Sequence, residues 1–214
     1  MTQPEPSLSS RGVFIAVEGG DGAGKSTQCR LLREWLEELG HTVVVTREPG
    51  GTPFGRTVRE LVLHGQHVAP RAEALLFAAD RAHHVETLIR PALGRAEMVI
   101  TDRYVDSSIA YQGAGRDLGV DEVRRLNMWA TGGLVPALTV LVDVPAEIGR
   151  ARREGVHDRM ESEADYFHCA VREHFLTLAG TDPDRYLVVD GERSAEQIHR
   201  IVRVRVAKLP GVAR

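Results

Sequence analysis

The chain has 214 residues, a formal net charge of -3 and 27% charged residues. This length allows one α/β domain with a substantial core and leaves too little for a second full domain. The near-neutral charge is not typical of general polyanion binding, so we expect no nucleic-acid partner. No apolar run approaches the roughly 20 residues that cross a bilayer, so we expect no membrane partner either.

The N-terminal segment is polar and lacks the charged and apolar regions of a secretory signal. We expect residues 1–11 to form a flexible tail and residues 12–209 to form the single domain. Two cysteines, Cys29 and Cys169, lie in expected helices and form no ligand cluster. We expect reduced, partly buried thiols, which are typical of a cytoplasmic protein.

An apolar run at 13–17 leads into a glycine-rich stretch that is followed by a helix-forming segment. Its spacing, G-x-x-x-x-G-K-S, is that of a Walker A phosphate loop, whose backbone N–H groups surround an anion. Lys25 would reach the β/γ-phosphates and Ser26 would offer its hydroxyl to Mg²⁺, while the helix N-terminus adds partial positive charge. The alternative is an ordinary glycine-rich turn. The residues expected to bind the nucleoside triphosphate are Gly19, Gly20, Asp21, Gly22, Ala23, Gly24, Lys25, Ser26 and Thr27.

Apolar periodicity predicts the elements that follow. Apolar residues from Leu31 to Leu39 predict a helix that Gly40 ends, and the apolar face of a later helix is expected at Ala72, Leu75, Leu76 and Ala79. The expected elements are a buried strand 42–46, helices 53–64 and 70–88, a strand 98–101, a loop 113–119, a helix 120–131, a strand 137–142, a helix with a core face from Phe167 to Leu178, a strand 186–190 and a final helix capped by Ser194 and Gln197. Alternating valines at 202–206 leave a terminal strand as an alternative.

Two of the expected strands end in charged residues. Ligands of parallel sheets bind beyond the carboxyl ends of strands, so Arg47 is placed to hold an anion, unless it forms a solvated pair with Glu48. Asp102 has the position of a Walker B carboxylate, which holds Mg²⁺ directly or through water. Arg103 beside it could bridge phosphates, and an ion pair that fixes the loop is the alternative.

Phe77 and Arg81 lie four residues apart and share a helix face. An aromatic ring beside a planar cation can stack on a base and hydrogen-bond its carbonyl, although core packing of Phe77 and a surface position of Arg81 are the alternatives. The segment 105–113 is dense in neutral hydrogen-bonding groups, which suit a nucleobase and a sugar. We expect no metal ligation by His83 and His84, because adjacent helical residues point about 100° apart.

Four arginines occur within ten residues, from Arg150 to Arg159, and they are flanked by acids. This composition predicts a mobile lid over about 149–161 that closes over phosphates. Arginine suits that task because its fork pairs phosphate oxygens bidentately and keeps its charge. The alternative is a solvated helix end.

Five apolar strands separated by helices predict a parallel sheet with helices on both faces, the α/β P-loop NTPase architecture. On its motifs the chain resembles the bacterial type of thymidylate kinase, from about Gly12 to the final helix. The matching stretches are F-I-A-V-E-G at 14–19, R-E-P-G-G-T at 47–52, L-F-A-A-D-R at 76–81, D-R-Y at 102–104, S-S at 107–108 and A-Y-Q-G at 110–113.

The resemblance implies a site for the acceptor nucleotide dTMP. Phe77 would stack on thymine, Arg81 would hydrogen-bond its carbonyl, and Ser108 would address the pyrimidine edge. Tyr111 would lie against the sugar where a 2′-OH would project, which selects deoxyribose. The implied dTMP-binding residues are Asp21, Arg47, Pro49, Phe77, Arg81, Arg103, Ser107, Ser108, Tyr111 and Gln112.

The implied reaction is the Mg²⁺-dependent transfer of the ATP γ-phosphoryl group to dTMP, which gives dTDP and ADP. Members of this type take an arginine from the lid instead of the loop, which agrees with Gly22 in the loop and an arginine-rich lid. The implied catalytic residues are Lys25, Asp21, Arg103, Arg153 and Arg159, and the implied metal ligands are Ser26 and Asp102. The resemblance also implies a homodimer.

Two other functions remain open at this point. A kinase of a different nucleotide or nucleoside would use the same loop, because pocket size is not readable from the sequence. A P-loop switch protein would bind a triphosphate without a small-molecule acceptor, but the N-K-x-D motif of guanine recognition is absent.

Overall fold

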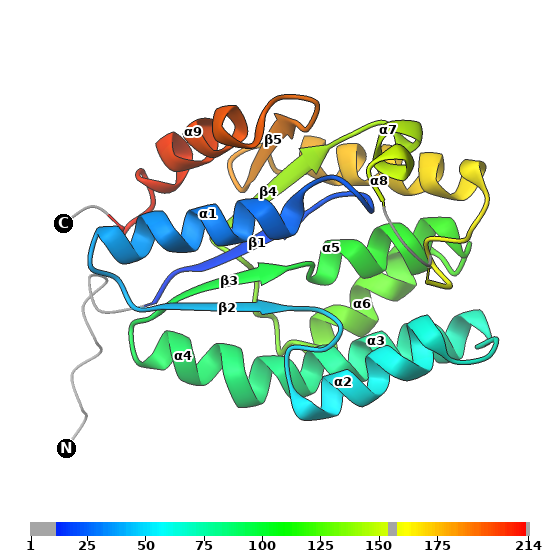
Figure 1. The fold of residues 1–214 in the computed structure, drawn as a ribbon. Coiled ribbons are helices and arrows are strands. Elements are labelled where there is room, and N and C mark those ends of the chain that lie inside the picture. The colour runs from blue at the N-terminus through cyan, green and yellow to red at the C-terminus, as the bar shows by residue number, and fades with distance from the viewer. Residues whose placement is uncertain (1–11, 154–157, 213–214) are drawn as a thin grey trace, which may run out of the picture.

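The computed structural model describes residues 12–153 and 158–212, which form a five-stranded sheet with helices on both faces (Figure 1). Neighbouring strands are all parallel, in the order β2-β3-β1-β4-β5. The strands are β1 (Phe14–Glu18), β2 (Val43–Arg47), β3 (Met98–Asp102), β4 (Leu138–Asp143) and β5 (Tyr186–Asp190). The predicted parallel α/β architecture is therefore confirmed.

Helical segments make the crossovers that parallel strands require. They are α1 (Lys25–Glu38), α2 (Pro53–Arg59) continued by the π-helical turn η2 (Glu60–His64), α3 (Pro70–His84) continued by η3 (Val85–Ile89) and α4 (Arg90–Gly94), α5 (Val105–Ser108) continued by η4 (Ile109–Gly115), α6 (Val120–Ala130), α7 (Ala146–Ala151), α8 (Asp165–Thr181) and α9 (Ala195–Val206).

Residues of β1 alternate between two cores, as a strand covered on both faces requires. Ile15 packs with Leu36 of α1 and Val202 of α9 on one face. Phe14 packs with Phe175 of α8 on the other face, where α4 also lies (Figure 1). The carboxyl ends of β1, β2 and β3 consequently open at one edge of the sheet, where ligands of such folds bind.

Strand β2 corrects one prediction. A run of valines is typical of a strand buried on both faces, but β2 is an edge strand that pairs only with β3, and Val45 is 40% exposed. The strand also begins and ends one residue later than predicted.

The helices differ from the prediction in three further places, two of them boundaries and one the exposure of a side chain. The helix predicted over 70–88 runs to Gly94, because the Arg90 N–H bonds to the Val85 carbonyl in a π-helical turn that continues into α4. The predicted loop 113–119 is helical as far as Gly115. Leu39, expected on the buried face of α1, is 42% exposed at its C-cap.

At the C-terminal end the helical prediction is confirmed and the alternative of a terminal strand is wrong. The Ser194 hydroxyl accepts from the Gln197 N–H, and the Gln197 side chain accepts from the Ser194 N–H, which is a capping box for α9. Both cysteines are free thiols, but Cys29 is fully buried and Cys169 is exposed, so neither is partly buried.

Helix α3 buries a different face from the one that apolar periodicity predicts. Leu75 and Ala79 are exposed, whereas Glu73, Arg81 and His84 are buried. Burying charged groups is unfavourable unless each finds partners, so this inverted face indicates that other elements supply them.

No helix within the described ranges is long and apolar enough to cross a membrane. The tail predicted at 1–11 and the lid positions 154–157 lie outside those ranges.

Glu18, the last residue of β1, is fully buried and connects β1 to the loop after β3. Its Oε1 accepts hydrogen bonds from the Tyr104 N–H at 2.8 Å and the Ser107 N–H at 3.2 Å, and its Oε2 accepts from the Ser107 hydroxyl at 2.6 Å. Burial and the Asp106 carboxyl raise the pKa of Glu18 to about 7, although these donors lower it. The carboxyl group thus fixes two segments that border the site.

Replacing Glu18 with Gln is expected to remove part of the pH dependence of stability. Because the folded-state pKa is raised, Glu18 contributes stability that is fully present below about pH 4.5 and is lost as the pH rises through about 7. We expect the free energy of unfolding of the wild type, relative to Glu18→Gln, to fall across this window when both are measured by urea unfolding. A difference that stays constant across the window would contradict the expectation.

Candidate active site

The loop between β1 and α1 adopts the conformation that its glycines predict. Gly22 and Gly24 have φ angles of 76° and 94°, in the left-handed region that favours glycine. A Cβ at Gly22 would lie 2.0 Å from the Gly149 carbonyl oxygen, so α7 packs directly on the loop backbone. Lys25 opens α1 and donates from Nζ to the Gly20 carbonyl at 2.7 Å. Burial lowers the pKa of Lys25 and the adjacent Arg103 adds to this, while nearby carboxylates oppose it.

Ser26 and Asp102 form the candidate metal site. The Ser26 hydroxyl, in the first turn of α1, donates to Asp102 Oδ2 at 2.6 Å, because β1 and β3 are neighbours in the sheet. This pair of oxygen ligands fits Mg²⁺, which takes one or two carboxylates and completes its shell with waters and substrate phosphates. Within residues 12–153 and 158–212 there is no larger cluster of His, Cys, Asp or Glu that could hold a metal.

A cleft of about 410 Å³, here called the phosphate cleft, lies over the carboxyl ends of β1, β2 and β3. Its volume falls in the range of roughly 300–1,000 Å³ that is typical of small-molecule sites. The cationic lining residues are Lys25, Arg47, Arg59, Arg103 and Arg152. The other lining residues are Asp21, Gly22, Gly24, Ser26, Thr27, Glu48 and Asp102. Much of the predicted ATP-binding set is therefore brought together with the two predicted metal ligands.

A second cavity of about 130 Å³, here called the inner cavity, adjoins the first. Every residue predicted to bind dTMP lines it except Arg47, which lines the phosphate cleft. Its remaining lining residues are Glu48, Arg59, Leu63, Asp158, Met160 and Glu161. Four residues, Asp21, Glu48, Arg59 and Arg103, line both spaces, so the cavities share a wall.

Arg103 is the central residue of this shared wall. It has a φ of 71°, and its Nη2 donates to Asp21 Oδ1 at 2.5 Å. The Tyr111 hydroxyl donates to the other Asp21 oxygen at 2.9 Å, and the Arg103 guanidinium lies 5.0 Å from the centre of the Tyr111 ring. Burial opposes ionisation of Asp21, but Arg103 and Lys25 outweigh it and hold the pKa of Asp21 well below its usual range. The pair is therefore ionised and fixes Arg103 between the cavities.

Arg81 is 2% exposed, so the alternative of a surface position is wrong. Its Nε donates to Glu48 Oε2 at 2.6 Å, and its Nη1 donates to Ser108 Oγ at 2.9 Å and to Asn127 Oδ1. Its Nη2 donates to the Tyr104 carbonyl at 3.0 Å. These contacts give the guanidinium a single orientation at the wall of the inner cavity.

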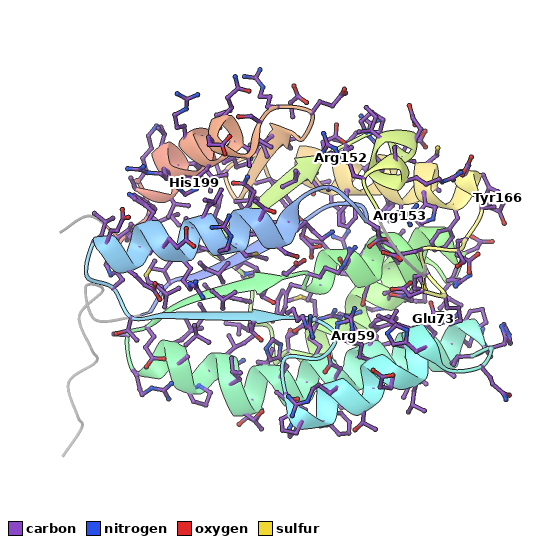
Figure 2. The ribbon with its side chains drawn as sticks, viewed as in Figure 1. Arg59, Glu73, Arg152, Arg153, Tyr166 and His199 are labelled. Carbon is purple, nitrogen blue, oxygen red and sulfur yellow. The ribbon has the colours of Figure 1, made fainter. Side chains whose placement is uncertain are left out.

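Two arginines of the predicted lid lie beside the phosphate loop, as Figure 2 shows for Arg152 and Arg153. Arg152 lines the phosphate cleft and donates to the Gly191 carbonyl at 2.7 Å. Arg153 donates to the Glu161 carbonyl at 3.1 Å and lines a small cavity that it shares with His168. Of these two, only Arg152 faces the phosphate cleft in this conformation.

Arg159 instead faces α3. Its Nη2 donates to Glu73 Oε2 at 2.5 Å, and its Nε donates to the Val62 carbonyl at 2.9 Å. Glu73 is 0% exposed and also accepts from Gln112 Nε2 at 2.9 Å and from Arg116 Nε at 3.3 Å. The predicted catalytic Arg159 is thus held against Glu73 of α3 and the Val62 carbonyl, and it lines neither the phosphate cleft nor the inner cavity.

Several residues that border the site have positions that no sequence motif predicted. Glu48 is 3% exposed, so the alternative of a solvated pair with Arg47 is wrong. Burial and the adjacent Arg47 lower the pKa of Arg59, which lines both cavities and belongs to no motif that would have marked it. His84 was considered only as a metal ligand, although its position three residues after Arg81 puts both on one helix face.

The arrangement separates two kinds of chemistry. The phosphate cleft gathers cations around an oxygen-ligand pair, which suits phosphate groups and a divalent cation. The inner cavity combines Phe77, Tyr111 and hydroxyl or amide groups with the guanidinium of Arg81, which suits a base and a sugar. Two phosphorylated ligands could therefore meet at the shared wall.

Comparisons with known proteins agree with this arrangement. The family model described as thymidylate kinase matches residues 17–202. A thymidylate kinase of Clavibacter michiganensis subsp. michiganensis (strain NCPPB 382) is 58% identical over 202 residues, covering 92% of this chain and 96% of the relative. The thymidylate kinase of Bifidobacterium longum (strain NCC 2705) is 51% identical and covers 92% of this chain and 98% of the relative. That of Synechococcus sp. (strain JA-2-3B'a(2-13)) is 47% identical and covers 92% of this chain and 96% of the relative. The chain therefore belongs to the thymidylate kinase family.

Proposed function

We propose that the chain transfers the γ-phosphoryl group of ATP to dTMP, giving dTDP and ADP. The observation that carries this proposal is the wall that the phosphate cleft and the inner cavity share, with Arg103 at its centre. A triphosphate held by the loop and a monophosphate held with its base in the inner cavity would meet at this wall. The names of the related proteins support dTMP as the acceptor.

The acceptor base would lie against Phe77, with its carbonyl facing Arg81. A guanidinium has five N–H donors, and four of those of Arg81 have protein partners, which leaves one for a ligand. Ser108 and Gln112 would address the pyrimidine edge. The Tyr111 ring packs edge-on against Phe167, with the two ring centroids 6.0 Å apart, so the ring is held in place. A ring held there would occupy the space that a 2′-OH of the sugar needs.

The transfer needs positioning and charge neutralisation more than covalent chemistry. Arg47 and Arg103 would hold the acceptor phosphate in line with the γ-phosphoryl group, and Asp21 would keep Arg103 oriented. Lys25 would neutralise charge on the transferring group. A phosphate oxygen is already a nucleophile at neutral pH, so the acceptor requires no strong general base.

Mg²⁺ would be held by Ser26 and Asp102, whose oxygens lie 2.6 Å apart at the N-terminus of α1. When bound, it would neutralise negative charge on the phosphates. The positions of Ser26 and Asp102 therefore determine where the bound cation would neutralise the phosphates.

The segment 149–161 is proposed as a lid that supplies arginine to the phosphates. Arg153 and Arg159 are candidates that require the lid to rearrange, because neither lines the phosphate cleft. Arg152 already lines the cleft, so we add it as a catalytic candidate that requires no rearrangement.

A homodimer is proposed from apolar side chains on adjoining helices. Phe54, Leu61 and Leu75 are 46%, 51% and 58% exposed on α2, η2 and α3, and Trp129 is 82% exposed on α6. Helix α3 contacts both α2 and α6, so these positions belong to neighbouring helices. Exposed apolar groups of this kind mark interaction surfaces, and a second copy of the chain would cover them.

The proposed activity is tested by product formation from ATP and Mg²⁺ with dTMP, dUMP, UMP, CMP, AMP or GMP. We expect kcat/KM for dTMP to exceed that for dUMP by at least about tenfold, because one methyl group in an apolar pocket is worth roughly 10- to 200-fold. ATP hydrolysis without acceptor should be slow, since lid closure excludes water. Hydrolysis without acceptor preference would favour a switch protein, and preference for another monophosphate would favour a different kinase.

Replacing Arg152 with Ala is expected to lower kcat by about 10²-fold or more, as loss of one preorganised charge-stabilising donor does. The KM for dTMP should change little, because Arg152 does not line the inner cavity. Arg150→Ala is the matched control, since Arg150 pairs with Asp165 and is 46% exposed. Equal kcat values for the two variants would contradict a role for Arg152, and Arg153→Ala and Arg159→Ala measured alongside would identify the lid arginine that acts.

Light scattering on the purified chain should give twice the mass of one chain. Leu75→Asp should give the mass of a single chain, because it places a carboxylate in the proposed apolar interface. Leu176→Asp is the control at a site on α8 outside that surface, where Leu176 is 37% exposed. A wild type with the mass of one chain would refute the dimer.

A further inference from the structure

A line of buried polar side chains runs from the end of β2 into the inner cavity. Thr46 Oγ1 lies 2.7 Å from His84 Nε2, and His84 Nδ1 lies 2.8 Å from Glu48 Oε1. Glu48 Oε2 accepts from Arg81 Nε at 2.6 Å, and Arg81 lines the inner cavity. Thr46 is 8% exposed and the other three are 0–3% exposed, so the line is shielded from solvent.

The donor and acceptor properties of these groups fix the direction of the bonds to Glu48. An ionised carboxylate only accepts, so His84 Nδ1 donates its proton to Glu48. The other ring nitrogen, Nε2, lies 2.7 Å from the Thr46 hydroxyl, which can donate to it or accept from it. His84 Nε2 is therefore hydrogen-bonded to Thr46, and His84 Nδ1 is hydrogen-bonded to Glu48.

Glu48 divides its two oxygens between His84 and Arg81. A carboxylate beside a guanidinium often forms two parallel N–H···O bonds, but here Arg81 bonds to one oxygen only and the other accepts from His84. The Nη groups of Arg81 remain directed at Ser108 Oγ and the Tyr104 carbonyl instead. The orientation of Arg81 at the inner cavity thus depends on a residue that does not line that cavity.

We propose that His84 is a positioning residue for base recognition: by holding one oxygen of Glu48, it fixes the Arg81 guanidinium in the orientation that meets the acceptor carbonyl. This inference rests on the proposed function, because Arg81 is the group proposed to contact thymine. Thr46 completes the device by orienting the imidazole ring. Without His84, the Glu48 carboxylate would lose the contact that fixes its own orientation, and Arg81 Nε would lose a fixed acceptor.

The Thr46–His84 pair is covered on one side by the backbone of Gly51. A Cβ at Gly51 would lie 2.4 Å from Thr46 Oγ1 and 2.7 Å from His84 Nε2, so the backbone at Gly51 closes over the pair. On the opposite side of Arg81, Asn127 accepts from its Nη1 and donates to the Val123 carbonyl at 2.8 Å. The guanidinium is therefore held by Asn127 and by Glu48, and Glu48 is in turn held by His84.

The test compares His84→Leu, which removes both ring nitrogens, with His84→Asn, whose amide N–H₂ can replace Nδ1–H as the donor to Glu48. Thr46→Val removes only the hydroxyl, and His83→Leu is the control on the exposed neighbouring histidine. For each variant we would measure kcat, the KM for dTMP, the KM for ATP and the thermal unfolding midpoint. The ratio of kcat/KM for dTMP to that for dCMP reports whether a carbonyl is still preferred over an amino group.

For His84→Leu we expect the KM for dTMP to rise about tenfold, with kcat and the KM for ATP within about threefold, because the lost bond positions a binding group only. The preference for dTMP over dCMP should fall as well. His84→Asn should recover most of the loss, Thr46→Val should show a smaller change of the same kind, and His83→Leu should match the wild type.

A His84→Leu variant with an unchanged KM for dTMP would overturn the proposal, as would a His84→Asn variant no better than His84→Leu. If His84→Leu does not fold, Thr46→Val and His84→Asn decide the matter, and changes in unfolding midpoint without a change in the KM for dTMP would show a purely structural role. A wild type that does not phosphorylate dTMP overturns the proposed function and this inference together. A wild type that does, with variants that leave the KM unchanged, overturns the inference alone.

Discussion

The ion pair between Arg103 and Asp21 is the interaction on which the site depends. Arg103 follows β3 and Asp21 belongs to the loop after β1, so neighbouring parallel strands bring the two together at 2.5 Å. The pair forms the wall between the phosphate cleft and the inner cavity. Because the pKa of Asp21 is held low, the pair stays ionised at neutral pH and keeps one arginine at the wall of both cavities.

A second constraint is the burial of charge on α3. Arg81 and His84 on one turn share Glu48, and Glu73 at the start of the helix holds Arg159 of the proposed lid. Removing one partner of a buried ion pair costs roughly 3–5 kcal/mol, so such groups are tolerable only as complete sets. Glu48 and Arg81 line the inner cavity, and Glu73 accepts from Gln112, which also lines it, so the stability of α3 and the orientation of the site depend on the same contacts.

The sequence predicted the parts of the site that depend on local backbone requirements and strand order. The phosphate loop needs glycine at positions such as Gly22, and the carboxyl ends of parallel strands must meet at one edge, which located Arg103. It did not predict the buried face of α3, because apolar spacing cannot indicate a partner such as Glu48, 33 residues before Arg81. The contact of Arg159 with Glu73, 86 residues apart, was likewise invisible to local patterns.

The most direct measurement is the structure of the chain crystallised with dTMP, Mg²⁺ and a non-hydrolysable ATP analogue. We expect thymine in the inner cavity against Phe77 and Arg81, with the acceptor phosphate and the γ-phosphate on either side of Arg103. We also expect the metal at Ser26 and Asp102. A thymine bound outside the inner cavity, or an acceptor phosphate and a γ-phosphate that do not both contact Arg103, would contradict the proposed arrangement.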